Sequence, residues 1–201
     1  MTQGELGTRG SAEIRFKEAQ AAKDILGVHI RENLGFADGF FLNDKTHQLE
    51  VIKMIRKYQP DMVLCNAIDD RHIDHPKGSD LVSNACFLSG LLKIETELEG
   101  ESQQHWRPKQ VYHYMQWKNI NPDFVVDVTG FMDIKMKSVL AYSSQFYDPD
   151  SKEPETPITS QNFTDSVKYR ARDLGRMIGV DYAEGFNSER YVAVENLSKL
   201  I

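Results

Sequence analysis

Residues 69–78 carry the densest group of chemically active side chains in the sequence, DDRHIDHPKG. His72 and His75 are three residues apart, and Asp74 lies between them. Imidazole nitrogens are good zinc ligands, and a neighbouring carboxylate can orient or charge-stabilise an imidazole ring. This spacing therefore indicates a metal site built around His72, Asp74 and His75.

The same residues also fit a charged surface turn that caps the next helix, because two potential ligands do not make a metal site. Their position favours the functional interpretation. They directly follow residues 61–68, a short apolar segment typical of a strand buried in a parallel sheet. Ligands bind just beyond the carboxyl ends of such strands.

A second candidate is the segment GELGTRG at residues 4–10, which opens the first predicted helix. Its glycines permit a close backbone approach, and a helix N-terminus attracts anions. The segment matches neither the Walker nor the dinucleotide-binding pattern, and a flexible glycine turn explains it equally well. Arg15 and Arg71 could each hold a carboxylate through two hydrogen bonds, although an isolated arginine is more often a solvated surface charge.

Helical periodicity and capping residues predict five helices, at 11–26, 44–58, 76–92, 130–144 and 161–178. Strands are expected near 28–33, 61–68, 110–117 and 124–128. Helices between buried strands predict right-handed βαβ units, and so an α/β fold whose mostly parallel sheet carries helices on both faces. Residues 146–160 are rich in Pro, Asp and Glu and are expected to form a long exposed loop, often a lid or a binding loop.

Composition narrows the class of protein. The chain has 201 residues and a formal net charge of −6. This length argues for one domain, and the acidic balance argues against a nucleic-acid partner. No apolar run reaches about 18 residues and no signal peptide is visible, so no membrane partner is expected. Cys65 and Cys86 lie in apolar stretches and are interpreted as reduced, buried thiols of a cytoplasmic protein.

Several segments together carry a family resemblance. These are T-x-G-E-x-G-T-R-G at 2–10, the helix with Arg15, and D-D-R-H-x-D-H at 69–75. With them the chain resembles the PIG-L/LmbE-like zinc deacetylases. Later segments such as NACFLSGL, YHYMQW and YAEGF are most similar to the bacterial bacillithiol biosynthesis deacetylases of the first type. The resemblance implies a single domain over residues 1–201 with a Rossmann-like three-layer α/β sandwich.

The resemblance also implies an activity and roles for residues. The activity is zinc-dependent N-deacetylation of N-acetyl-α-D-glucosaminyl L-malate, which yields glucosaminyl malate and acetate in bacillithiol biosynthesis. His75 is implied as a zinc ligand, His72 as the group that stabilises the transition state or protonates the leaving amine, and Asp74 as the acid that orients His72. Substrate binding is implied for Arg15, Arg71, Gly4, Glu5 and, less directly, Arg107. One Zn²⁺ per subunit, a hexamer or trimer of identical chains and a cytoplasmic location follow from the same resemblance.

One motif of the family is missing. The Ala-His-Pro-Asp-Asp segment, which supplies two further zinc ligands and the general base, does not occur in residues 1–201. The chain is therefore expected to lack the first strand-helix unit of the fold, on the order of 30–40 residues. An internal start codon, a truncated inactive gene and a second chain that supplies the missing part are the three explanations. A catalytic zinc takes three protein ligands, so this polypeptide is expected to bind zinc poorly and to have negligible activity.

Two alternatives to the malate conjugate stay open. One is a deacetylase of another N-acetyl sugar or of a thiol conjugate, and the other is a non-catalytic remnant that keeps the pocket. Phe163 stands in the region where some relatives place a tyrosine that donates to the oxyanion, and it has no hydroxyl. Asp70 stands where certain actinobacterial relatives carry a catalytic tyrosine.

Overall fold

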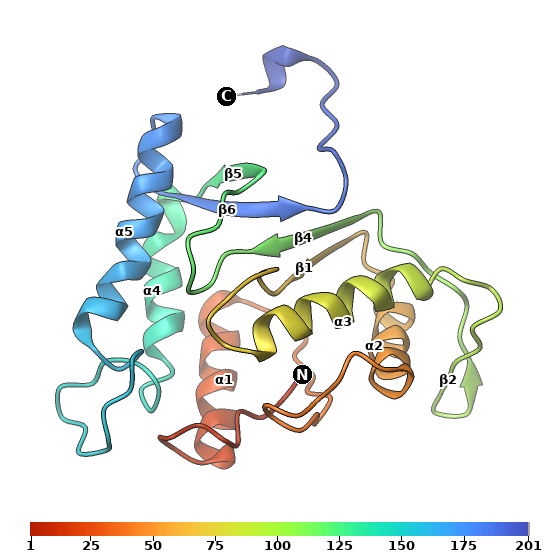
Figure 1. The fold of residues 1–201 in the computed structure, drawn as a ribbon, viewed down its shortest axis with the longest axis horizontal. Coiled ribbons are helices and arrows are strands. Elements are labelled where there is room, and N and C mark those ends of the chain that lie inside the picture. The colour runs from red at the N-terminus through yellow and green to blue at the C-terminus, as the bar shows by residue number, and fades with distance from the viewer. Residues whose placement is uncertain (201) are drawn as a thin grey trace. The chain divides into compact units, whose positions relative to one another are not determined.

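The computed structural model describes residues 1–200 as a mixed α/β fold (Figure 1). Its α-helices are α1 (Ala12–Leu26), α2 (Lys45–Tyr58), α3 (Asp74–Leu88), α4 (Met132–Leu140) and α5 (Gln161–Ile178). Its strands are β1 (Met62–Cys65), β2 (Glu97–Leu98), β3 (Glu101–Ser102), β4 (Gln110–Tyr114), β5 (Phe124–Asp127) and β6 (Ala183–Ser188). Two 3₁₀ turns, η1 (Thr129–Phe131) and η2 (Leu197–Lys199), complete the elements. None of the described helices is long and apolar enough to cross a bilayer.

The chain divides into two compact units, which are described separately. The first unit contains Met1–Asp38 and Val126–Glu184, and the second contains Gly39–Val125 and the chain from Gly185 on. The first unit therefore holds α1, α4 and α5, and the second holds α2, α3, β1 and β4. The prediction of a single domain over 1–201 stays a prediction.

The central sheet has four strands in the order β1-β4-β6-β5. β1 and β4 are parallel, with Met62 opposite Gln110 and Cys65 opposite His113. β6 runs antiparallel to β4, with Tyr112 opposite Ser188. The expected α/β class with a central sheet and flanking helices is confirmed, and the antiparallel β6 makes the sheet mixed. The parallel pair β1 and β4 brings the segments that follow these strands to the same edge.

The second unit is built around α3, which contacts β1, β4 and α2. Leu81 and Ala85 of α3 are fully buried, and Ile52 of α2 is almost fully buried. The buried Arg56 of α2 reaches the carbonyls of Ser89, Leu91 and Ile94, which lie where α3 ends and in the turn that follows. This guanidinium thereby satisfies carbonyl groups that a helix end leaves without partners.

The two cysteines are free and buried in the second unit, as the sequence predicts. Burial raises the pKa of Cys65 and of Cys86 to about 12 each. Since the thiolate is the reactive form, we expect neither thiol of the folded protein to react with a disulfide reagent at pH 8. Unfolding in guanidinium chloride should release two reactive thiols per chain, the number in the sequence. A thiol that reacts rapidly in the native protein would contradict the burial described.

The first unit packs α1 against α4 and α4 against α5 (Figure 1). Met132 and Met136 of α4 meet Ala171 of α5 in a small apolar cluster. The buried carboxylate of Glu18 on α1 accepts hydrogen bonds from the Ser144 backbone N–H at 2.6 Å and from the Ser144 hydroxyl at 2.7 Å. Glu18 thus ties α1 to the turn that follows α4.

The loop at 146–160 is long, as predicted, and it is anchored in the first unit. Buried Arg9 donates to the carbonyl of Pro154 at 2.6 Å and to that of Glu153 at 3.1 Å. The Gly10 backbone N–H donates to the Glu153 carboxylate at 3.4 Å. The middle of the loop is therefore fixed to the glycine-rich turn at 4–10.

The predicted elements differ from the structure most clearly at one strand that does not form, one helix that is shifted and one strand that was not predicted. Residues 28–33 form no strand, and Val28 and Ile30 are exposed, because no described strand pairs with them. The helix predicted over 76–92 spans Asp74–Leu88, so Pro76 lies inside its first turn, where a missing N–H costs nothing. Strand β6 was not predicted, because the Gly and Asn of AEGFNS are rare in strands.

Candidate active site

The two clustered histidines lie at the carboxyl edge of the parallel pair β1 and β4. His72 lies two residues before α3, and His75 lies in its first turn. Their rings are stacked, with centroids 5.1 Å apart and an interplanar angle of 27°. His72 is exposed and His75 is half-buried. The predicted position at a strand end is thus observed, in the place where open α/β sheets bind ligands.

Asp70 lies behind His75, away from solvent. Its Oδ2 is 3.1 Å from His75 Nδ1 and accepts a hydrogen bond of 2.8 Å from the Trp117 backbone N–H. Burial alone would raise the pKa of Asp70, but the N–H groups of Trp117, His75 and Arg71 together lower it. Burial lowers the pKa of His75, and the Asp70 carboxylate offsets only part of this effect. At neutral pH the pair is therefore an ionised carboxylate beside a neutral imidazole, whose Nε2 is left as the ligating nitrogen.

The tautomer of His72 is set by the start of α3. The Asp74 backbone N–H donates to His72 Nδ1 at 3.2 Å. Because Nδ1 accepts this hydrogen bond, the proton of the neutral ring is on Nε2. An imidazolium would place a second N–H against the Asp74 N–H. His72 therefore presents an Nε2–H donor, the kind of group that stabilises negative charge developing on a substrate oxygen.

The Asp74 carboxylate does not orient His72, in contrast to the role that the resemblance implies. Its Oδ1 is 2.8 Å from Lys77 Nζ, and its Oδ2 accepts the Gly39 backbone N–H at 2.7 Å. Burial would raise the pKa of Asp74, but these two donors lower it. The residue orients His72 through its backbone N–H, because in the first turn of a helix this group is free to bond outside the helix.

Arg71 lies over the ring of Trp117, with its guanidinium carbon 4.7 Å from a ring centroid. Trp117 follows β4, which ends at Tyr114, whereas the sequence predicted a strand over 110–117. Sequence reasoning missed the place of Trp117 beside the histidines. The available signal was the position of Trp117 at the carboxyl end of the predicted strand, because ligands bind at such ends.

Arg15, Gly4 and Glu5 belong to the first unit. The Arg15 guanidinium is enclosed by the turn at 4–10: it donates to the Arg9 carbonyl at 3.0 Å, and a Cβ added at Gly4 or Gly7 would overlap it. The Glu5 carboxylate accepts the Asp38 backbone N–H at 2.8 Å, which lowers the pKa of Glu5. Gly4 and Gly7 therefore leave the space that the Arg15 guanidinium occupies.

The structure does not bring Arg107 to the histidines. Arg107 stacks on Phe87 with its guanidinium carbon 4.5 Å from the ring centroid, and it donates to the Phe87 carbonyl at 2.9 Å. Phe87 is in the last turn of α3, whereas His75 is in the first, and a helix of 15 residues is about 22 Å long. Phe163 stacks on Phe146 in the first unit, with ring centroids 6.0 Å apart.

The described residues do not supply a complete zinc site. A catalytic zinc takes three protein ligands and a water, and His75 with its Asp70 partner suits one of these positions. Among residues 1–200 there is no group of three or more His, Cys, Asp or Glu side chains placed to hold a metal ion. Zinc binding by this chain therefore stays a prediction.

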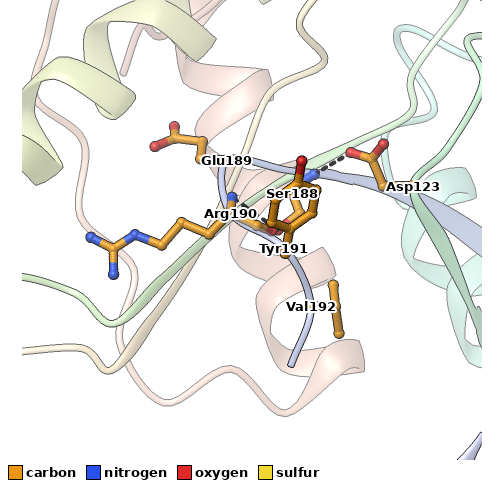
Figure 2. Close-up of a pocket in the computed structure, with 6 residues that line it drawn as sticks. All are labelled: Asp123, Ser188, Glu189, Arg190, Tyr191 and Val192. Atoms are coloured by element: carbon orange, nitrogen blue, oxygen red, sulfur yellow. Dashed lines mark hydrogen bonds between the residues drawn. The ribbon is translucent and has the colours of Figure 1, made fainter. Parts of the chain in front are cut away.

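A concave surface lies elsewhere in the second unit, beyond the end of β6 (Figure 2). It is lined by Asp123, Ser188, Glu189, Arg190, Tyr191 and Val192. The Ser188 backbone N–H donates to the Asp123 carboxylate at 2.8 Å, as Figure 2 shows. None of the predicted site residues lines this surface, so the candidate active site remains at the histidines.

The chain belongs to the PIG-L/LmbE-like family. The family model described as "PIG-L: GlcNAc-PI de-N-acetylase" matches residues 1–86, which include the turn at 4–10 and both histidines. The conserved protein TT1542 from Thermus thermophilus is 32% identical in sequence, and its crystal structure matches this one with a TM-score of 0.85. That match covers 98% of this chain and 82% of the Thermus protein.

Two deacetylases are also similar. The diacetylchitobiose deacetylase of Thermococcus kodakarensis is 27% identical over 188 residues, or 92% of this chain. This chain spans 66% of that relative, just under two thirds of its length. The N,N'-diacetylchitobiose deacetylase from Pyrococcus horikoshii has the same fold, with a TM-score of 0.75 at 22% identity over 100% of this chain and 76% of its own.

The fold is also found in a protein named for a different reaction. GalB, the 4-carboxy-2-hydroxymuconate hydratase from Pseudomonas putida KT2440, matches with a TM-score of 0.69 at 22% identity, over 92% of this chain and 75% of its own. A shared fold therefore does not assign the reaction, and function has to be argued from the site.

Proposed function

We propose that this chain carries the histidines that stabilise the transition state in a hydrolase that removes the acetyl group from an N-acetylated sugar. The observation that carries the proposal is the pair of histidines at the β1 edge, where His72 presents Nε2–H and His75 is held neutral by burial beside ionised Asp70. The membership of the PIG-L/LmbE-like family and the two similar deacetylases support the same reaction class.

In amide hydrolysis a water oxygen bonds to the acetyl carbon, the C–N bond breaks, and the leaving nitrogen takes up a proton. The attacking water supplies that proton, so the amine leaves neutral and acetate is the other product. His72 Nε2–H donates a hydrogen bond to the carbonyl oxygen, where negative charge develops in the transition state. The Asp74 backbone N–H keeps the ring in the tautomer that this step requires. Arg71, exposed beside His72, provides a positive charge for a carboxylate on the substrate.

Within this class we propose N-acetyl-α-D-glucosaminyl L-malate as the substrate, on the resemblance to the bacillithiol biosynthesis deacetylases. Malate carries two carboxylates, and a cationic group at the site of an acidic protein fits such a conjugate. A second candidate is a non-catalytic sugar-binding protein. It is favoured by one observation, the missing three-ligand metal group among residues 1–200.

Acetate release tests the proposal. The protein would be purified from its own cells through a tag placed at the C-terminal end of the chain, so that any companion chain and metal are retained. N-acetylglucosaminyl malate, diacetylchitobiose and N-acetylglucosamine would be offered as substrates. We expect acetate release that a His75→Ala variant lacks, and fastest turnover of the malate conjugate. No release from any of the three would contradict deacetylation, and binding without release would support the non-catalytic candidate.

Metal analysis of the 201-residue polypeptide is a separate test. Because the described residues provide no three-ligand group, we expect zinc far below one ion per chain after purification and dialysis. Zinc near one ion per chain would contradict this prediction. A His75→Ala variant is the control, since residual zinc that it retains is bound elsewhere.

A further inference from the structure

Three positive side chains lie near the histidines, and two of them are neutralised. Lys77 Nζ is 2.8 Å from the Asp74 carboxylate, and Lys118 Nζ is 2.8 Å from the Asp69 carboxylate. The third is Arg71, which is exposed. Within residues 1–200 its guanidinium has no carboxylate partner and makes no hydrogen bond, and its contact is the ring of Trp117 at 4.7 Å.

The backbone that carries Trp117 is fixed by consecutive hydrogen bonds to the segment after β1. Gln116 Oε1 accepts from Asn66 Nδ2 at 3.0 Å and from the Ala67 backbone N–H at 3.1 Å. The Trp117 backbone N–H donates to Asp70, and Lys118 pairs with Asp69. Residues 116–118 are therefore tied to residues 66–70, which also lead into the histidines.

Asp70 contacts both the histidine pair and the segment that carries Trp117. One of its oxygens, Oδ2, contacts both His75 Nδ1 and the Trp117 backbone N–H. The position of Trp117 is therefore set by the same buried carboxylate that sets His75. A planar guanidinium held on an indole face keeps its N–H edge open, and that edge matches a carboxylate through two parallel hydrogen bonds.

We infer that Trp117 is a positioning residue, which holds Arg71 so that its guanidinium receives a carboxylate of the sugar conjugate and selects anionic over neutral substrates. The inference rests on the proposed function and deepens it, since it assigns the preference for an anionic substituent to one residue pair. Trp117 acts through Arg71 and takes no part in the hydrogen bond that His72 donates.

Binding of two product amines measures the selectivity without turnover. Glucosaminyl L-malate is the anionic probe and methyl α-D-glucosaminide the neutral one, titrated calorimetrically into protein purified from its own cells. For Arg71→Gln we expect the affinity for the malate conjugate to fall about 10- to 100-fold, because a charge-assisted hydrogen-bond pair is lost. For Trp117→Ala we expect a fall of about tenfold. The affinity for the neutral probe should change less than about twofold in both.

Salt dependence separates positioning from a merely structural role. In the unmodified protein the preference for the anionic probe should weaken as ionic strength rises, and in Arg71→Gln it should be weak at all salt concentrations. Trp117→Phe keeps an aromatic face and should retain most of the preference. Trp106→Phe is the matched control, because this second tryptophan donates to the Pro60 carbonyl and should leave the preference intact. Arg176→Gln is the charge control, because Arg176 pairs with Asp173 on α5.

The outcomes distinguish the inference from the function on which it rests. An anionic preference that survives Trp117→Ala, or an unmodified protein without any anionic preference, overturns the inference and leaves deacetylation standing. Failure to bind either amine and to release acetate from any substrate overturns the proposed function itself. If Trp117→Ala and Trp117→Phe both lose affinity for both probes to the same extent, Trp117 has a structural role. That outcome would also overturn the inference.

Discussion

Replacing His72 by alanine is expected to lower kcat for acetate release by about 10²- to 10³-fold, the range that removal of one oxyanion-stabilising donor costs. The physical reason is the fixed Nε2–H of this ring, whose Nδ1 accepts the Asp74 backbone N–H. Because the hydrogen bond from Nε2–H strengthens only as negative charge develops in the transition state, kcat and kcat/KM should fall together while KM stays nearly constant. The measurement is steady-state acetate release by the protein purified from its own cells.

His105→Ala serves as the control for this variant. His105 is exposed and lies outside the histidine pair, so its replacement should leave kcat within about twofold. A decrease smaller than tenfold, or an increase in KM alone, would show that His72 binds substrate and does not stabilise the transition state.

The second large effect is expected at Arg56, and it concerns stability. Replacing Arg56 by methionine keeps the aliphatic length but removes donors to the Leu91 and Ile94 carbonyls and to the Thr96 hydroxyl. Buried acceptors left without a donor each cost about 1–3 kcal/mol. We therefore expect the free energy of unfolding to fall by about 3 kcal/mol or more, which lowers Tm by roughly 6–12 °C for a chain of this size.

Chemical denaturation of the 201-residue polypeptide measures this loss. Lys53→Met on the same helix is the control, because Lys53 forms a surface ion pair with Glu50, whose contribution should be below about 1 kcal/mol. Arg56→Lys should recover only part of the stability, since one ammonium cannot reach all the acceptors that the planar guanidinium bonds. A loss of less than about 1 kcal/mol for Arg56→Met would contradict the role assigned to this residue.

Much of the fold follows from local sequence signals. The N-cap Ser11 accepts from the Ile14 backbone N–H, and Gly27 ends α1 in the left-handed conformation with φ of 67°. These are the residues from which the first helix was predicted, because caps and periodicity are both local. The apolar strand before the histidines was predicted for the same reason.

The failures come from long-range contacts. Residues 28–33 have a strand-like composition but find no strand partner among the described residues, and composition alone cannot show this. Strand β6 shows the opposite failure, because it forms although the sequence did not predict it. Its Gly185 backbone approaches Met115 and Pro122 so closely that a Cβ would lie 2.6 Å from the methionine sulfur. The glycine that hides the strand in the sequence is required by its packing.

The candidate site also contains features that the sequence predicted and features that it did not. The position of His72 and His75 at a strand end was predicted from the residue order. The exchange of roles at Asp74, whose backbone orients His72 while its carboxylate meets Lys77, depends on where α3 begins. The pairing of Arg71 with Trp117 joins residues 46 positions apart in the sequence, and no local pattern reports such a contact.

The attachment of Arg9 to Glu153 and Pro154 has a consequence for how this protein can vary. A bond at the middle of the loop at 146–160 divides it into two shorter spans with separately fixed ends. Doubling the length of a flexible span costs only about 0.6 kcal/mol of closure entropy. Insertions on one side of the attachment should therefore be tolerated without disturbing the other side. The segments on either side of the attachment can diverge independently, while substitution of Arg9 affects both.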